Sequence, residues 1–188
     1  MKKQFKIIIL GILSINTVFA AEDNGYKSFN DITSALNPLE VIANHGGVRR
    51  SIDLNIQFAL DSAEILPAAS RQIEALGKAM QSPKLVHCNI LLTGHTDATG
   101  DAGRNNELSK QRSNAVKHRL VDYFELSGSR FNTVGKGSSE LIPKLAKNDA
   151  KHRRVTIELI DVEQCKKQAN NSVKGLKKDK DGDIKVDW

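Results

Sequence analysis

Aromatic residues are scarce in this sequence, at 5% of 188 residues. Proteins that bind single-stranded nucleic acid commonly stack the bases on aromatic side chains, so the composition argues against that class. The sequence also contains no His-Glu-x-x-His, no Ser-x-x-Lys and no Cys-x-x-Cys pattern. His95 and Asp97 supply half of a metal site at most, because no third ligand follows at a recognisable spacing. We therefore expect a protein that is not an enzyme and that holds neither a metal ion nor a cofactor.

The sequence contains one long apolar run, over residues 7–18. It follows three lysines within the first six residues and precedes small residues at the −3 and −1 positions of a cleavage site before Ala21. This arrangement predicts a secretory signal peptide over residues 1–20, and an uncleaved anchor is the alternative. Cleavage leaves 25 Lys and Arg against 22 Asp and Glu, so the net charge falls from +6 to about +3. Such a mild charge does not indicate a nucleic-acid partner.

Four strands and two helices are predicted in the order strand-helix-strand-helix-strand-strand. Alternation of apolar and polar residues indicates the strands, and apolar residues three or four apart indicate the helices. The strands fall near 52–58, 88–94, 131–134 and 155–159, and the helices near 69–80 and 105–124. This order is typical of an α/β fold, here an α+β sandwich in which helices pack on one mixed sheet.

The predicted domain covers residues 51–162. Residues 21–50 precede it as an arm with one or two helical turns, and residues 163–188 follow it as a polar, flexible tail with few apolar residues. Two cysteines, Cys88 and Cys165, flank the second and the last predicted strand. If these strands are antiparallel, both cysteines lie at one edge of the sheet, where a disulfide is geometrically reasonable in an exported protein. Two free thiols are the alternative.

The second predicted helix contains a charged residue within its apolar stripe. On a helical wheel one face carries Leu108, Ala115, Val116, Leu120 and Tyr123. Arg112 falls in the middle of this face, with Arg119 close by, and a guanidinium is costly to bury without an anionic partner. Arg112 either extends to solvent or pairs with an internal carboxylate, or it lines a pocket that receives a ligand carboxylate. Asp97, just past the second strand, either caps a turn or accepts a ligand ammonium group.

Asp97 and Arg112 are also part of a larger set of motifs. The set comprises Thr96-Asp97-x-x-Gly100, Asn105-x-x-Leu108-Ser109-x-x-Arg112, Ala115-Val116, Gly135-x-Gly137 with Pro143, Arg153-Arg154-Val155, and Phe58 followed by Asp61-Ser62-Ala63-Glu64-Ile65. In this order, over about residues 51–160, the motifs resemble the signature of OmpA-like peptidoglycan-binding domains, the type found in OmpA, Pal and MotB. Two positions depart from the family pattern: Ala59 replaces an aspartate after Phe58, and His152 replaces an asparagine before the arginine pair.

The resemblance implies that the domain binds the diaminopimelate of the peptidoglycan stem peptide. Asp97 would hold the ammonium group and Arg112 the carboxylate. The other positions that match the family pocket, or could add contacts to it, are Asn105, Asp61, Thr96, Thr99 and Arg154. We therefore expect a periplasmic protein associated with the cell wall, with no nucleic-acid partner. The alternative is an accessory component of an envelope or flagellar motor complex that docks on the wall through the same domain and binds its protein partner through residues 21–50 or 163–188.

Overall fold

The computed structural model describes residues 25–39 and 50–174. A four-stranded mixed sheet forms its centre, with the strand order β1-β4-β2-β3. Strand β4 is antiparallel to both β1 and β2, whereas β2 and β3 are parallel. The strands are β1 (Ser51–Leu54), β2 (Asn89–His95), β3 (Phe131–Gly137) and β4 (Val155–Ile160). This mixed sheet confirms the predicted α/β fold class.

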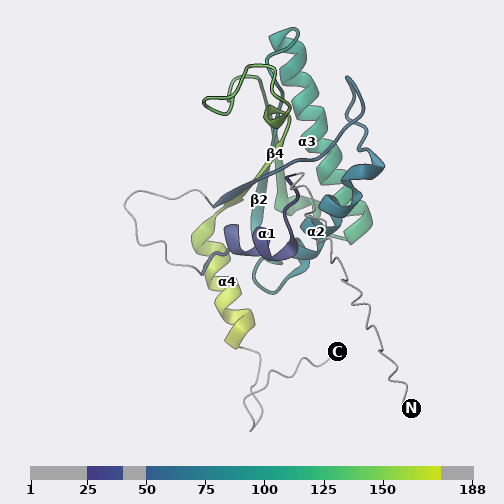
Figure 1. Ribbon diagram of the computed structural model, residues 1–188. Helices are drawn as coiled ribbons and strands as arrows, with labels where there is room; N and C mark the ends of the chain where they lie inside the picture. The colour runs from purple at the N-terminus through teal and green to yellow at the C-terminus, as the bar shows by residue number, and fades with distance from the viewer. Residues whose placement is uncertain (1–24, 40–49, 175–188) are drawn as a thin grey trace, which may run out of the picture.

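Four helices accompany the sheet, and α3 runs alongside it (Figure 1). Their bounds are α1 (Phe29–Ala35), α2 (Ser70–Gln81), α3 (Ala102–Phe124) and α4 (Val162–Lys174). Three short 3-10 turns lie in the connections between these helices and strands: η1 (Pro67–Ala69), η2 (Gly128–Arg130) and η3 (Ala150–His152). Alternation along β2 and β4 directs one set of apolar side chains into the core, as expected for a sheet with one covered face. Against them pack Leu76 and Met80 of α2 together with Ile32 of α1, all fully buried.

Two glycines allow α3 to pack directly on the sheet. Gly94 of β2 and Gly135 of β3 are paired across the parallel ladder. A Cβ atom on Gly94 would overlap the carbonyl oxygen of Ser109, and one on Gly135 would lie 2.6 Å from the backbone nitrogen of Lys110. The Ser109 hydroxyl also accepts a hydrogen bond from the backbone N–H of Gly137, at 2.9 Å. The middle of α3 is therefore fixed by backbone contact, as at other sites where glycine permits close approach.

This contact corrects two sequence-based expectations. Strand β3 does not end near Val134 but continues to Gly137, because its glycines face the helix rather than breaking the ladder. The buried face of α3 is also rotated from the predicted one, and it consists of Asn105, Ser109, Arg112, Ser113, Val116 and Leu120. Tyr123, expected on the apolar face, is instead 73% exposed, since small serines rather than large apolar residues meet the glycines.

The ends of the domain differ from the expected arm and tail. Strand β1 spans four residues, shorter than the predicted 52–58, and Phe58 lies beyond it in an isolated bridge to Ile65. In the arm, α1 packs on α2 and buries Ile32. Residues 163–174 are helical rather than an irregular tail, because they belong to α4, whose Cys165 is buried. The predicted signal peptide and residues 175–188 lie outside the described residues.

A disulfide joins Cys88 to Cys165, which confirms the bridged alternative. Cys88 immediately precedes β2 and Cys165 lies in the first turns of α4, shortly after β4. Because β2 and β4 are antiparallel neighbours, with Asn89 opposite Ile160, the start of one strand meets the end of the other. The two Cα atoms are 4.8 Å apart, within the usual range for a disulfide. The bridge thus attaches α4 to the edge of the sheet where β2 begins.

Replacing both cysteines by serine should lower the free energy of unfolding by about 2–4 kcal/mol, because the bridge closes a long loop, 77 residues in sequence separation, in the unfolded chain. Urea unfolding followed by circular dichroism measures the change. Dithiothreitol should lower the unfolding midpoint of the wild-type protein and leave that of the double serine variant unchanged. A wild-type midpoint that does not respond to reductant would contradict the bridge.

The substitution Gly94→Ala should lower the free energy of unfolding by about 3 kcal/mol or prevent folding, because its methyl group would overlap the α3 backbone. The matched control is Gly103→Ala in the exposed first turn of α3, where the new Cβ would lie 3.2 Å from a carboxylate oxygen of Asp101. There we expect a change of less than about 1 kcal/mol. Equal unfolding midpoints for the two variants would show that the close approach is not required.

Candidate functional site

The candidate site lies at the edge of the sheet where β2 ends and β4 begins. Thr96 and Asp97 directly follow β2, and Arg153 lies two residues before the start of β4. The backbone of the two segments is joined at this edge, where His95 N–H donates to the Arg154 carbonyl at 2.9 Å. Arg112 reaches the same region from α3. Both Asp97 and Arg112 are buried, each with 7% of its surface exposed.

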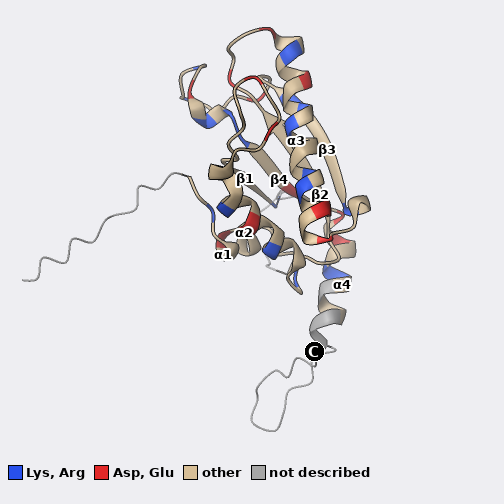
Figure 2. Cartoon of the chain, turned by 90° about the vertical axis from the view of Figure 1, so that its right-hand side faces the viewer, with Lys and Arg blue, Asp and Glu red and all other residues tan. Residues whose placement is uncertain are grey.

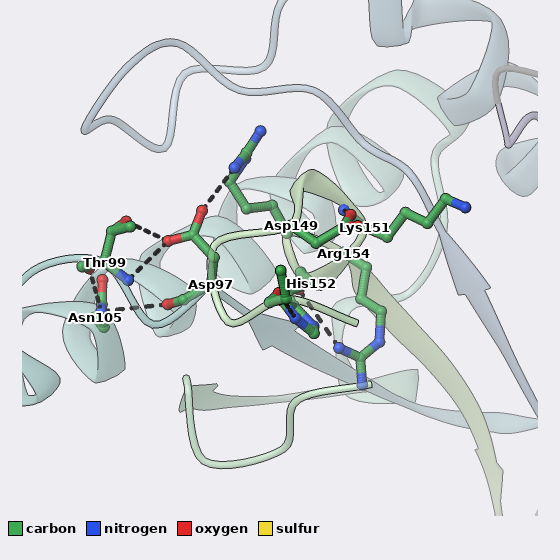
Figure 3. A network of polar contacts seen from close by, with 9 residues as sticks. Asp97, Thr99, Asn105, Asp149, Lys151, His152 and Arg154 are labelled. Atoms are coloured by element: carbon green, nitrogen blue, oxygen red, sulfur yellow. Dashed lines mark hydrogen bonds and ion pairs between the residues drawn. The ribbon is translucent and has the colours of Figure 1, made fainter. Parts of the chain in front are cut away.

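Asp97 is held by hydrogen bonds on both carboxylate oxygens. Its Oδ1 accepts from the backbone N–H of Thr99 at 3.0 Å and from the Thr99 hydroxyl, and its Oδ2 accepts from Nη1 of Arg153 at 2.6 Å (Figure 3). Burial raises the pKa of Asp97, but the hydrogen bonds from Thr99 and Arg153 outweigh it and hold the pKa below its usual range. The Asn105 side chain stabilises this loop by donating a hydrogen bond to the Thr99 carbonyl at 2.8 Å. Asp97 is therefore a fixed, ionised carboxylate.

Among the described residues, Arg112 is fixed through one of its three guanidinium nitrogens. Its Nε donates to the Ser62 carbonyl at 2.9 Å, and its guanidinium carbon lies 5.0 Å from the centre of the Phe58 ring. Burial and the nearby charge of Arg153 lower its pKa, whereas the charge of Asp97 raises it. Within residues 25–39 and 50–174, its two Nη atoms have no hydrogen-bond partner, although the side chain is buried. Such a group is suited to receive a ligand carboxylate.

A pocket of about 700 Å³ opens beside Arg112. Five of its six charged lining residues are basic, namely Lys27, Arg112, Lys151, Arg153 and Arg154, and Asp53 is the acidic one. Phe58 supplies an aromatic wall. The pocket therefore combines positive charge with one apolar surface, which favours an anionic ligand of small size.

The structure brings most of the predicted site residues together, but not all in the expected role. Arg154 lines the pocket, yet it pairs with Asp53 at 3.0 Å and points away from Asp97 (Figure 3). Asp61 does not line this pocket; its carboxylate forms an exposed ion pair with Arg104 instead. Thr96 is buried, and its hydroxyl has no partner within the described part of the chain. Hydrogen bonds join Asp97, Thr99 and Asn105 into one group, whereas Arg112 is bonded to Ser62 and lines the pocket with Arg153, the partner of Asp97.

Sequence reasoning missed Arg153 and Phe58 as pocket residues. It chose Arg154 from the adjacent arginine pair, although consecutive residues leading into a strand point to opposite sides of the sheet. Arg153 reaches Asp97, whereas Arg154 reaches Asp53 on the neighbouring strand. Continuing the alternation of β4 backward would have indicated that Arg153 lies on the side of the sheet that faces Asp97. Predicting Phe58 as a pocket residue requires knowing that Arg112 lies over its ring, and no local sequence pattern shows this.

His152, which departs from the family pattern, supports the loop behind the site. It is fully buried, and its Nδ1 accepts from the Ile142 N–H at 3.1 Å. Its Nε2 therefore carries the proton and donates to the Ala146 carbonyl at 2.8 Å. Both ring nitrogens are satisfied, so His152 fixes the segment that carries Lys151 and Arg153 rather than contacting a ligand.

A second network of polar contacts crosses the sheet from His95 through Thr156 and Asp53 to Arg154. The Thr156 hydroxyl donates to Asp53 at 2.5 Å and lies 3.1 Å from His95 Nε2, so this nitrogen is the protonated one. The other ring nitrogen of His95 is buried without a partner among the described residues. Burial, reinforced by the charge of Arg154, lowers the pKa of His95 to about 4. His95 is thus a neutral structural residue at neutral pH.

The part of the chain that the structure describes contains no group of three or more His, Cys, Asp or Glu residues that could hold a metal ion. Within the same residues, no helix is sufficiently long and apolar to span a bilayer.

Stability should fall as the pH is lowered from about 6.5 to about 4. The unfolded chain protonates His95 near pH 6.5, whereas the folded protein does so only near pH 4, so acid favours the unfolded state by up to about 3 kcal/mol. Urea unfolding across this range should show a flatter profile for His95→Gln. The exposed His87→Gln serves as control and should keep the wild-type slope; a His95→Gln profile parallel to wild type would refute the assignment.

Comparison with known proteins finds relatives that are longer than the matched region. Over 110 residues, 57% of this chain and 31% of the relative, the sequence is 30% identical to outer membrane porin F of Pseudomonas aeruginosa. It is 31% identical to the Escherichia coli protein YfiB over 104 residues, 54% of this chain and 64% of YfiB. The chain therefore spans less than two thirds of the length of either relative.

A solved structure and a family model agree on the fold. The OmpA-like domain of FopA1 from Francisella tularensis has a TM-score of 0.51 and 18% identity, covering 61% of this chain and 75% of that one. The model of the OmpA family matches residues 57–155, more than half of the sequence. This stretch begins just before Phe58 and includes Asp97, Arg112 and Arg153. The chain belongs to the OmpA family.

Proposed function

We propose that this protein binds peptidoglycan non-covalently in the periplasm, through the diaminopimelate of the stem peptide, and that it acts as a binding protein rather than an enzyme. One observation carries the proposal: Arg112, 7% exposed, presents two guanidinium nitrogens without a partner among the described residues to a pocket that is also lined by Arg153, the ion-pair partner of Asp97. A single carboxylate or a single amine would use only half of this arrangement. A zwitterionic amino-acid end uses both charges.

The two charges divide the recognition between them. The ligand carboxylate accepts two parallel hydrogen bonds from the Arg112 guanidinium, a geometry that a planar guanidinium favours. The ligand ammonium donates to Asp97, whose carboxylate is already oriented by Thr99. Because Thr99 orients Asp97 and Ser62 orients Arg112 before the ligand arrives, the main reorganisation on binding is that of the Arg153 side chain. Each charge-assisted contact then contributes about 1.5–3 kcal/mol.

Arg153 occupies part of the ammonium position in the free protein. Its Nη1 lies 2.6 Å from Oδ2 of Asp97, and its side chain is about half exposed. An incoming ammonium competes with this ion pair, which limits the net gain from Asp97. Once released, the Arg153 guanidinium remains beside the pocket, where a second ligand carboxylate is a ready partner. The site therefore favours an anionic peptide over a free amine.

The expected affinity for one stem peptide is modest, in the millimolar to micromolar range, or about −4 to −8 kcal/mol. A polymeric wall presents many stems at high local concentration, so rebinding retains the protein without tight single contacts. An envelope location agrees with the name of the relative from Pseudomonas aeruginosa, an outer membrane porin. The motif resemblance to peptidoglycan-binding domains supports the same ligand.

Sedimentation with purified sacculi tests the proposal. Asp97→Ala and Arg112→Ala should each weaken binding about tenfold or more, because each removes one charge-assisted contact. Matched controls are Glu107→Ala, exposed on α3, and Arg71→Ala, exposed on α2, and both should pellet like wild type. Circular dichroism confirms that each variant is folded. If both site variants pellet as well as wild type, the proposed site is wrong.

A further inference from the structure

Two adjoining hollows, each of about 540 Å³, lie along α3 outside the pocket beside Arg112. They share Ile65, Arg119 and Tyr123, which form the boundary between them. Neither hollow has a role in the site described above. We propose that they bind the amino-sugar strand of peptidoglycan, the glycan, while the pocket beside Arg112 holds the peptide. The inference rests on the proposed function and extends it to the second component of the polymer.

Tyr123 gives these hollows an aromatic surface suited to a sugar. It is 73% exposed, and its ring packs edge-on against Phe124, with ring centres 5.2 Å apart. A pyranose ring presents C–H groups on its face and hydroxyl groups at its edge. An aromatic ring with a polar tip matches both, because its face accepts the C–H groups and its hydroxyl joins the polar rim. Half-buried Ala63, Ile65 and Ala115 provide the apolar floor.

Polar side chains with unused hydrogen-bonding capacity surround this floor. Those in the first hollow are Glu64, His118, Arg119 and Asp122. All four are exposed, and none of their side chains has a hydrogen-bond or ion-pair partner within residues 25–39 and 50–174. Acidic and basic groups alternate here, and Figure 2 shows both signs interspersed along α3. This balance suits an uncharged, hydroxyl-rich ligand, unlike the cation-rich pocket beside Arg112.

The spacing along α3 matches the length of a stem peptide. Arg112, Arg119 and Tyr123 are seven and eleven residues apart, so they share one side of the helix, about 10 Å and about 16 Å apart along its axis. Diaminopimelate is the third stem residue, and three extended residues span about 10 Å. A stem that runs from Arg112 toward the C-terminal end of α3 therefore places its sugar near Arg119, with Tyr123 one turn further along.

The segment from Phe58 to Leu66 contributes residues to both sites: its two ends line the pocket beside Arg112, and its middle lines the first hollow. Ser62 accepts the hydrogen bond from Arg112, and the next residues, Ala63 and Glu64, line the first hollow. Ala115, one turn along α3 from Arg112, lines it as well. Leu66 lines both the pocket beside Arg112 and the second hollow, so these two cavities adjoin.

The test compares two ligands with the purified chain by NMR titration: the stem tripeptide alone, and the same tripeptide attached to its disaccharide. Wild type should bind the disaccharide-tripeptide about five- to tenfold more tightly, because the sugar adds contacts at Tyr123. Tyr123→Ala should abolish this difference and leave the affinity for the tripeptide within about twofold of wild type. Leu60→Ala is the control, since Leu60 is 98% exposed, lies on the same loop and lines neither hollow.

Two results overturn the inference. Equal affinity of wild type for the two ligands would show that the sugar makes no contact, and an equal loss for both ligands in Tyr123→Ala would show an indirect effect. Because Tyr123 is exposed, the variant should fold, and an unchanged melting temperature verifies this. A wild-type protein that fails to bind the tripeptide at all is a different result, which overturns the proposed function itself.

Discussion

The direct contact between the α3 backbone and two glycines of the sheet determines the rest of this structure. With Gly94 and Gly135 beneath it, α3 lies closer to β2 and β3 than any side chain would allow. The helix position then fixes two residues of the proposed site: Asn105, which supports the loop of Asp97, and Arg112, two turns further along. A helix packed through larger residues would lift both away from the end of β2. The site is therefore a consequence of how the sheet and helix meet.

Charge is distributed unevenly over the domain, and this distribution divides the surface into regions of different chemistry. Five basic side chains line the pocket, and the buried carboxylate of Asp97 pairs with one of them, Arg153. Removal of Asp97 would leave Arg112 and Arg153 close together without compensation, which is unfavourable in a partly buried setting. Along the outer side of α3 the signs alternate. Under the two proposals above, these adjacent regions bind an anionic peptide and an uncharged sugar of one polymer.

Much of the fold followed from sequence patterns, whereas side-chain roles followed only in part. The alternating residues of β4 and the helical spacing of α2 predicted those elements within a residue or two, because burial of one face dictates both patterns. The wheel for α3 placed Tyr123 inside, since it could not show that serines face glycines on the sheet. The motifs predicted that Asp97 and Arg112 lie together, but the partner of Asp97 depends on which of two adjacent arginines turns inward. That choice is set by the tertiary register of β4.

The disulfide and the pocket lie at opposite ends of the central strands. Cys88 and Cys165 attach α4 where β2 begins and β4 ends, whereas Asp97 and Arg153 lie where β2 ends and β4 begins. A mechanical load between a ligand in the pocket and the chain beyond α4 is therefore directed along β2 and β4. In this shear direction the hydrogen bonds of the ladder bear force together rather than breaking one after another. The disulfide between Cys88 and Cys165 prevents α4 from detaching first, so the force is transmitted to the whole sheet.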